Sequence, residues 1–144
     1  MTPVPEVLLV DDNPADAALA REALEQSPFP CRVRETVNGD EALALLRRQG
    51  RFADGPLPDV IILDLNLPKR GGEVVLSELR SDPSLRQIPV VVFSTSRSNR
   101  DIVRCYQLGA NCYLSKPGNL KDFLSTVQMI GEYFGSRGAT LRGE

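Results

Sequence analysis

The sequence predicts an α/β fold in which a doubly wound parallel sheet of five strands is covered by five helices, a (βα)5 arrangement. Short apolar runs alternate along the chain with segments whose apolar residues have helical spacing. The apolar runs are nearly continuous, as expected of strands that are buried on both faces. Because parallel strands need helical crossovers, this alternation places helices on both faces of one sheet.

The first strand and helix are marked by apolar runs and by turn residues. A strand is expected over Glu6–Val10. Asn13 and Pro14 then open a helix, because asparagine is a good N-cap and proline suits the first helical turn. Apolar residues follow at helical spacing until Ser27-Pro28 ends the helix.

The second strand differs from the first in its pattern. Cys31–Val37 alternates apolar and charged residues, which predicts a more exposed strand. Asn38-Gly39 predicts a turn, and Asp40–Arg48 predicts the second helix. The segment 49–58 is rich in glycine and proline and is expected to be a long loop that could contact a partner.

The third and fourth strands are the most hydrophobic segments of the chain. Asp59–Leu63 predicts a strand, Asn66–Gly72 a loop, and Glu73–Arg80 a helix. Ile88–Phe93 predicts the next buried strand, with Pro89 near its start.

The last two helices enclose the fifth strand. A helix over Asn99–Leu108 is closed by Gly109, and a short strand over Cys112–Ser115 precedes a helix over Asn119–Phe134.

Length and composition indicate one globular domain, which we place at residues 1–135, followed by a polar tail at 136–144. The net charge of −2 and the scattered basic residues argue against a nucleic-acid surface. No segment has the length of a membrane span or the pattern of a signal peptide, so we expect a cytoplasmic protein. The cysteines (Cys31, Cys105 and Cys112) lack CxxC spacing and are expected to be reduced, mostly buried side chains.

Polar and charged side chains stand at the ends of four predicted strands. Asp11 and Asp12 follow the first strand, Asp64 the third, Ser94 the fourth and Lys116 the fifth. Because open parallel sheets bind ligands at the carboxyl ends of their strands, we expect these side chains to meet at one edge.

The residue types at this edge suit phosphoryl chemistry. The chain has no histidine, which excludes histidine-based nucleophilic sites and leaves oxygen ligands for any metal ion. Three converging carboxylates repel one another unless a cation lies between them, and Mg²⁺ prefers such oxygen ligands. Lys116 and Ser94 could contact phosphoryl oxygens, and the centrally placed Asp64 could be the nucleophile that forms an acyl phosphate. Asp11 has an alternative role as a cap of the first helix.

Four segments, taken in order, carry a family resemblance: VLLVDDNP, VIILDLNLP, PVVVFSTS and LGANCYLSKP. Together they resemble the receiver domain of bacterial two-component response regulators, whose fold is flavodoxin-like. The resemblance covers about residues 5–134. VDDNPAD and the long 49–58 loop look most like the single-domain regulators that are paired with phytochromes.

The resemblance implies a role for each acidic residue. Asp64 would accept a phosphoryl group from a phosphohistidine on a sensor histidine kinase, for which a bacterial phytochrome is the candidate. Asp12 would bind Mg²⁺ directly, Asp11 would assist, and Asn66 would offer its backbone carbonyl.

The resemblance also implies roles for residues of the last two strands. Lys116 would pair with Asp64 or its phosphate and be followed by a cis peptide to Pro117. Ser94 would bond a phosphoryl oxygen, with the backbone N–H of Thr95 facing the same group. Tyr113 would then swing inward, although a tyrosine on such a strand can also be an ordinary half-buried core residue.

The implied function is a switch without an outside substrate, and therefore not a conventional enzyme. The switched face would comprise the fourth helix, fifth strand and fifth helix, where a homodimer is also plausible. Two alternatives stay open: a docking module that is never phosphorylated, and a Mg²⁺-dependent phosphohydrolase. Phosphohydrolases usually carry a second aspartate two residues after the nucleophile, where this chain has Asn66.

Overall fold

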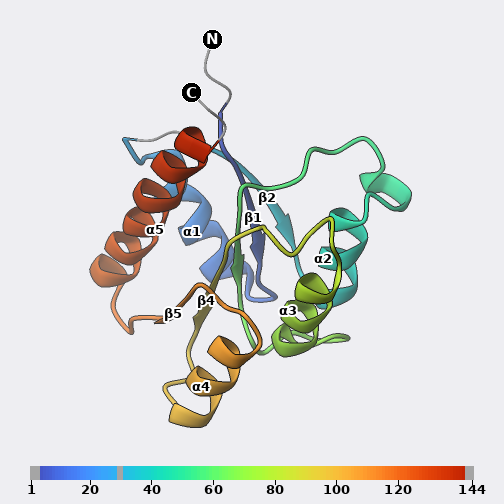
Figure 1. The fold of residues 1–144 in the computed structure, drawn as a ribbon. Coiled ribbons are helices and arrows are strands. Elements are labelled where there is room, and N and C mark those ends of the chain that lie inside the picture. Colours follow the sequence, from blue (N-terminus) through green and yellow to red (C-terminus); the bar gives the residue numbers. More distant parts are fainter. Residues whose placement is uncertain (1–3, 29–30, 142–144) are drawn as a thin grey trace.

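A computed structural model describes residues 4–28 and 31–141. The chain alternates strands and helices in the expected order (Figure 1). The elements are β1 (Glu6–Val10), α1 (Pro14–Glu25), β2 (Arg32–Thr36), α2 (Gly39–Leu46), a 3₁₀ turn η1 (Gly50–Phe52), β3 (Val60–Leu63), α3 (Gly72–Ser81), β4 (Val90–Ser94), α4 (Asn99–Gln107), β5 (Cys112–Ser115) and α5 (Leu120–Leu141).

The strands form one parallel sheet with the order β2-β1-β3-β4-β5. The predicted fold class is therefore confirmed. β1 and β3 are neighbours at the centre, and the strand order reverses direction there, which is the place where such sheets bind ligands. β2 lies at an edge and is the more exposed strand that its alternating sequence predicts.

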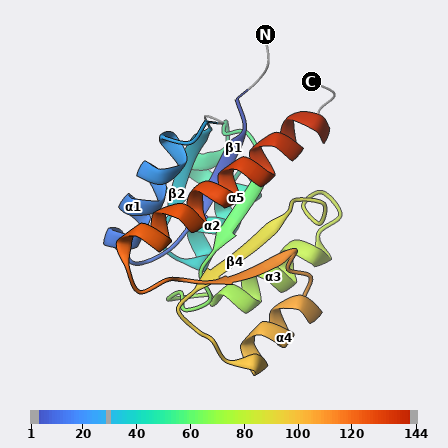
Figure 2. The ribbon, with the colours of Figure 1, turned by 90° about the vertical axis from the view of Figure 1, so that its left-hand side faces the viewer.

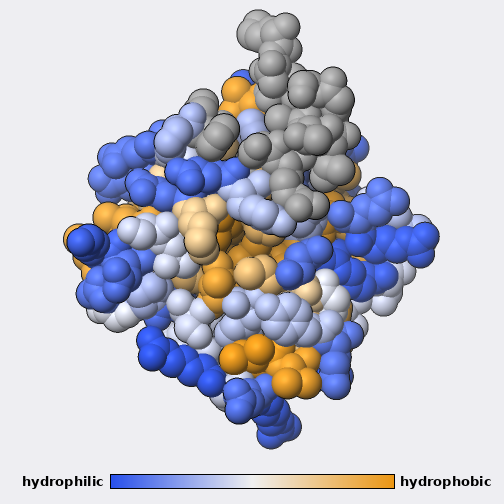
Figure 3. All heavy atoms as spheres, turned by 60° about the vertical axis from the view of Figure 1, so that its left-hand side comes forward, coloured by the Kyte–Doolittle hydropathy of each residue, from blue (hydrophilic) through white to orange (hydrophobic). Residues whose placement is uncertain are grey.

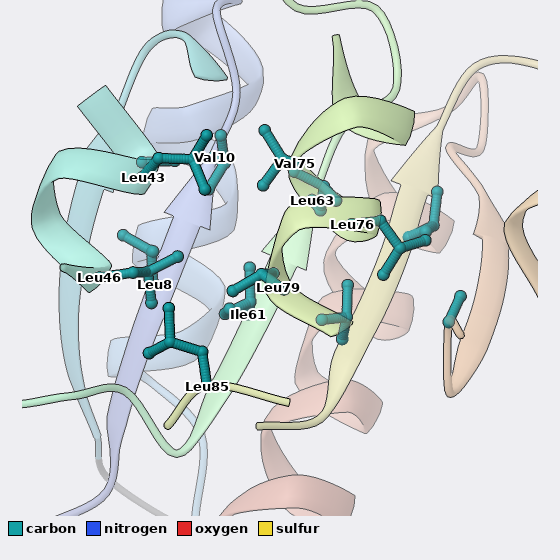
Figure 4. Close-up of a cluster of buried hydrophobic side chains, with 14 of the residues drawn as sticks. Leu8, Val10, Leu43, Leu46, Ile61, Leu63, Val75, Leu76, Leu79 and Leu85 are labelled. Atoms are coloured by element: carbon teal, nitrogen blue, oxygen red, sulfur yellow. The ribbon is translucent and has the colours of Figure 1, made fainter. Parts of the chain in front are cut away.

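Helices cover both faces of the sheet, α1 and α5 on one and α2, α3 and α4 on the other (Figures 1 and 2). Each face has its own hydrophobic core. Leu46 of α2 turns toward Leu8 of β1, and Leu79 of α3 toward Ile61 of β3 (Figure 4). Burial of these side chains removes them from water and holds the ends of β1 and β3 in place.

Side-chain caps explain where several helices begin. Asn13 accepts hydrogen bonds from the N–H groups of Ala15 and Asp16, and Asn38 accepts one from Glu41. The cap of α3 is Gly71, which offers no side-chain bond. The start of α3 is therefore set by another constraint, the close packing of the adjacent Gly72.

The main differences from the sequence prediction lie in one loop, one strand and one helix. The 49–58 loop contains the short turn η1, with Arg51 stacked over the ring of Phe52 at 4.6 Å. β4 begins at Val90 rather than Ile88. α5 continues to Leu141 instead of ending at Phe134, so part of the predicted tail is helical, while the domain boundary at 135 stays a prediction.

Arg80, at the end of α3, links the two segments that precede β4 and β5 at the amino edge of the sheet. Its guanidinium donates to the carbonyls of Arg86, Ile88 and Gly109 and to Oδ1 of Asn111, at 2.8–3.0 Å. In the part of the chain that the structure describes, Arg80 makes no ion pair. Burial accordingly lowers the pKa of Arg80.

The cysteines are free, and Cys105 is fully buried. Burial raises the pKa of Cys31 and of Cys105 to about 11. Their sulfurs are therefore protonated near neutral pH, as expected of structural side chains. Among the described residues, no helix is long and apolar enough to cross a membrane.

Candidate functional site

Backbone pairing brings the predicted strand-end residues to one edge of the sheet. The N–H of Asp64 donates to the carbonyl of Val10 at 3.0 Å, and the N–H of Lys116 donates to that of Ser94 at 2.7 Å. These bonds extend the ladder one residue beyond β3 and β5. Asp11, Asp64, Ser94 and Lys116 are all buried, whereas Asp12 is exposed.

The ammonium of Lys116 is the centre of this site. Nζ donates to Oδ2 of Asp11 at 2.8 Å, to Oδ2 of Asp64 at 3.0 Å and to Oδ2 of Asp16 at 3.0 Å. A lysine ammonium has three N–H groups, so each can serve one carboxylate. Lys116 is therefore fully bonded within the protein and fixed between β1, β3 and α1.

Asp16 is a site residue that sequence reasoning missed. It lies in the first turn of α1, and its side chain is 25% exposed. The available signal was an acidic residue in the first turn of a helix that begins directly after Asp11 and Asp12. Because that helix starts at the carboxyl end of β1, its first turn faces the same edge of the sheet.

The electrostatics of the site reflect competition between burial and pairing. Burial raises the pKa of Asp11, although hydrogen bonds from Lys116 and from the N–H of Asn13 oppose the shift. Burial alone would lower the pKa of Lys116, but its hydrogen bonds to Asp11, Asp16 and Asp64 outweigh burial and raise it. One ammonium thus faces several carboxylates, and the site holds excess negative charge.

The arrangement fits a divalent cation with a preference for oxygen. Asp11, Asp12 and Asp64 each offer a carboxylate oxygen, and these oxygens lie within 4.8 Å of one another. Asp12 is exposed, so an ion could approach from solvent and keep some of its water, as Mg²⁺ does. The N–H of Asn66 donates to Oδ1 of Asp64 at 3.3 Å, which places its backbone beside the cluster, while coordination by its carbonyl stays a prediction.

The end of β4 and the residues after it connect the carboxyl edge of the sheet to β5. The hydroxyl of Ser94 is wholly buried and accepts a weak bond from the N–H of Ser96 at 3.4 Å. The side chain of Tyr113 lies inward and its hydroxyl donates to the carbonyl of Ser96 at 2.7 Å. Thr95, between the two serines, is exposed.

Tyr113 has the burial of a core residue and a hydroxyl that bonds the segment after β4. It is 9% exposed, like a core residue, and its pKa is raised by burial. Its hydroxyl nevertheless holds the chain that follows Ser94, and its N–H donates to the hydroxyl of Tyr106 at 3.0 Å. A role as a switch stays a prediction, and the inward position is already present in this structure.

The expected cis peptide before Pro117 is wrong for this structure, because no described peptide bond is cis. A tight turn is not needed to aim Lys116. The ladder bond to Ser94 fixes its backbone, and the three carboxylates fix its ammonium.

A close backbone contact supports the residue at the end of β3. A Cβ atom on Gly72 would lie 2.4 Å from the carbonyl oxygen of Asp64 and 2.8 Å from Cα of Leu65. The N–H of Gly72 also donates to the carbonyl of Leu65 at 2.9 Å. The first turn of α3 is therefore packed directly on the backbone that carries Asp64, which fixes the start of a helix that has no side-chain cap.

Comparison with known proteins identifies the family. A model of the response regulator receiver domain matches residues 7–128. The chain belongs to this family. The response regulator Rcp1 of Synechocystis is 42% identical over 128 residues, which cover 89% of this chain and 87% of Rcp1. The probable methanogenesis regulatory protein FilR2 of Methanothrix harundinacea is also 42% identical and covers 89% of this chain, with 82% of FilR2 matched.

Solved structures place this receiver domain beside phytochrome response regulators. The phosphorylated cyanobacterial phytochrome response regulator RcpA is 45% identical, with a TM-score of 0.88 over 92% of this chain and 94% of RcpA. The Mn²⁺-bound form of Rcp1 is 42% identical, with a TM-score of 0.86 over 90% of this chain and 94% of that one. The predicted family and its phytochrome-associated relatives are thereby confirmed, and the protein is a response regulator receiver domain of two-component signalling.

Proposed function

We propose that Asp64 is the phosphoryl acceptor of this receiver domain and that the donor is a phosphohistidine on a sensor histidine kinase. One observation carries the proposal. The buried carboxylate of Asp64 lies within hydrogen-bond distance of the Lys116 ammonium and within 4.8 Å of two further carboxylates that can share a divalent ion. This combination provides a nucleophile and the positive charge that phosphoryl transfer requires.

The transfer can be written on named atoms. A carboxylate oxygen of Asp64 forms a bond to phosphorus while the phosphorus–nitrogen bond to the donor histidine breaks, and the imidazole leaves with the bonding electrons. Mg²⁺, held by Asp11, Asp12, Asp64 and the Asn66 carbonyl, would neutralise charge on the phosphoryl oxygens when bound. Lys116 adds positive charge at the same place, which lowers the barrier electrostatically.

Two groups at the carboxyl end of β4 complete the surroundings of the phosphoryl group. The hydroxyl of Ser94 donates to one phosphoryl oxygen, and the N–H of Thr95 faces another. The 3.4 Å bond that the hydroxyl of Ser94 accepts from the N–H of Ser96 is weak, so little is lost when that bond is given up.

Hydrolysis returns the switch to its starting state. Water attacks phosphorus, the bond to Asp64 breaks, and inorganic phosphate leaves. The protein thus processes only its own phosphoryl group and turns over no outside substrate, so it is not a conventional enzyme.

The output is a change in the face formed by α4, β5 and α5. Phosphorylation adds about two negative charges and new acceptor oxygens, which can bias a two-state element. Redirecting Ser94 displaces the chain whose Ser96 carbonyl holds Tyr113, so the state of Asp64 reaches β5 through that hydroxyl.

This face also supports a proposal about partners. Apolar residues stay exposed on α4 and α5: Val103, Tyr106, Leu120, Met129 and Tyr133. Figure 3 shows hydrophobic patches among charged side chains on the side of the molecule where α5 lies. Such patches suit a protein interface, and we assign them to a homodimer that forms in the cytoplasm. The phytochrome relatives support a phytochrome as the kinase.

Intact mass spectrometry after incubation with acetyl phosphate tests the acceptor. Wild type with Mg²⁺ should gain one phosphoryl group, because the small donor needs only the acceptor and the cations of the site. Asp64→Asn should gain none, and Mg²⁺ removal should reduce labelling of wild type by at least about tenfold. Asp122→Asn, at an exposed helix start, is the matched control and should label normally.

An adduct that persists in Asp64→Asn would place the acceptor elsewhere. No adduct on folded wild type, together with no binding of beryllofluoride, would indicate a docking module that is never phosphorylated.

A further inference from the structure

Asp16 is the one partner of Lys116 to which the proposed chemistry gives no task. Asp64 accepts the phosphoryl group, and Asp11 belongs to the carboxylates that can share an ion. Asp16 lies outside that group of carboxylates, yet its Oδ2 is 3.0 Å from Nζ, the same distance as that of Asp64. A buried ammonium that keeps a third carboxylate therefore needs an explanation.

The position of Asp16 is fixed by the same turn that follows β1. The N–H of Asn13 donates to Oδ1 of Asp11 at 2.9 Å. The side chain of Asn13 accepts from the N–H of Asp16 at 3.1 Å. Asp16 is thus held relative to Asp11 by two local bonds, and α1 behind it packs on the sheet through buried alanines.

Phosphoryl transfer changes the other two acceptors of Lys116. Asp64 loses negative charge on the oxygen that forms the new bond, and Asp11 must share its charge with a metal ion. A lysine side chain is flexible and loses entropy when it is held in one place. If only those two carboxylates held Nζ, its position would loosen during the reaction.

We propose that Asp16 is a positioning residue that anchors Lys116 while Asp64 and Asp11 change partners. The inference rests on the proposed phosphoryl acceptor. Asp16 keeps one N–H of Lys116, so that the N–H released by Asp64 remains aimed at the incoming phosphoryl oxygen. The anchor also ties the first turn of α1 to the site, since Asp16 belongs to that turn.

Two measurements on Asp16→Ala and Asp16→Asn test this role. The first is the initial rate of labelling by acetyl phosphate with saturating Mg²⁺. The second is hydrogen exchange of the lysine ammonium protons, followed by NMR after selective ¹⁵N-lysine labelling. The lysines of the chain are Lys69, Lys116 and Lys121, and the exposure of Lys69 and Lys121 makes them internal standards for fast exchange.

We expect Asp16→Ala to label about tenfold more slowly, the effect of one charge-assisted hydrogen bond, and to exchange its Lys116 protons faster. Asp16→Asn keeps an acceptor oxygen without the charge and should fall between Asp16→Ala and wild type. Asp122→Ala is the matched control. It also removes an aspartate from the first turn of a helix, where Asp122 bonds Asn119, but it should change neither measurement.

The outcomes separate this inference from the proposed function. If wild type gains no phosphoryl group, the proposed function is overturned. Hydrogen exchange of the Lys116 ammonium protons then decides by itself whether Asp16 holds the ammonium. If wild type is labelled, a rate for Asp16→Ala within twofold of wild type overturns the anchor. Slower labelling with unchanged Lys116 exchange also overturns it, because the effect would not pass through the ammonium. Faster labelling would mean that Asp16 holds Lys116 back.

Discussion

Two cations, the buried Lys116 and the half-buried Arg80, are held in opposite ways at opposite edges of the same sheet. At the carboxyl edge, all three partners of Lys116 are carboxylates. At the amino edge, the partners of Arg80 are backbone carbonyls and one amide oxygen. The pKa of Lys116 is raised by its partners against the effect of burial, whereas the pKa of Arg80 is lowered by burial.

The difference separates a reactive site from a structural link. Carboxylates can exchange an ammonium for a metal ion or a phosphoryl group, so the bonds of Lys116 can be replaced during function. Carbonyl oxygens of the chain have no such alternative, and Arg80 simply joins the end of α3 to the segments that precede β4 and β5. We therefore expect the contribution of Lys116 to stability to depend on whether Mg²⁺ is bound, and that of Arg80 to be the same with and without Mg²⁺.

The largest effect is expected for Lys116→Met without Mg²⁺. Removing the ammonium leaves the buried carboxylates of Asp11 and Asp64 without a cation, at a cost of about 3 kcal/mol in the free energy of unfolding. Saturating Mg²⁺ should reduce the loss to roughly 1 kcal/mol, because the ion neutralises the same carboxylates. Urea denaturation with and without Mg²⁺ measures both values, and equal losses would contradict the assignment of the metal to this cluster.

Arg80→Ala should cost about 2 kcal/mol in the free energy of unfolding, because it leaves the part-buried carbonyls of Ile88 and Gly109 without this donor. Arg80→Lys is the matched control for charge: a lysine cannot reach all four acceptors, so most of the loss should remain. Denaturation in urea should give the same loss with and without Mg²⁺. A loss that Mg²⁺ restores would mean that the amino edge is coupled to the site and that the two cations do not differ as described.

The smallest effect is expected when pH is varied. The folded-state pKa of Lys116 is raised above its ordinary value of 10.5, so its contribution is fully present below that pH and is lost only as pH rises through the folded value. The loss caused by Lys116→Met should therefore stay constant within about 0.5 kcal/mol between about pH 7 and pH 10. Urea denaturation at several pH values measures this loss. If the loss shrinks as pH rises within this range, the carboxylates do not raise the pKa of Lys116.

Most of the site could be predicted because its residues follow strands. A buried strand is visible as an apolar run, and parallel strands end at one edge, so Asp11, Asp64, Ser94 and Lys116 could be placed together from the sequence alone. Asp16 could not, because a carboxylate in a first helical turn usually only interacts with the helix dipole. Its direction toward Lys116 depends on how α1 leaves β1.

Other features have weaker signals in the sequence. The partners of Arg80 are mostly backbone carbonyls, which every residue possesses, so no pattern of residue types indicates the link. The cis peptide after Lys116 was expected from resemblance alone and is not present in this structure. The polar residues after Phe134 predict the end of α5 there, but the helix continues to Leu141.

The paired glycines before α3 bear on how freely this sequence can diverge. At Gly71, a Cβ atom would meet nothing closer than the carbonyl oxygen of Leu65 at 3.8 Å, so a side chain can be accommodated there. At Gly72, any side chain would push against the backbone that carries Asp64. Over generations, substitutions can therefore accumulate at Gly71, whereas selection removes them at Gly72. A residue with no reactive group thereby shares the mutational intolerance of the phosphoryl acceptor itself.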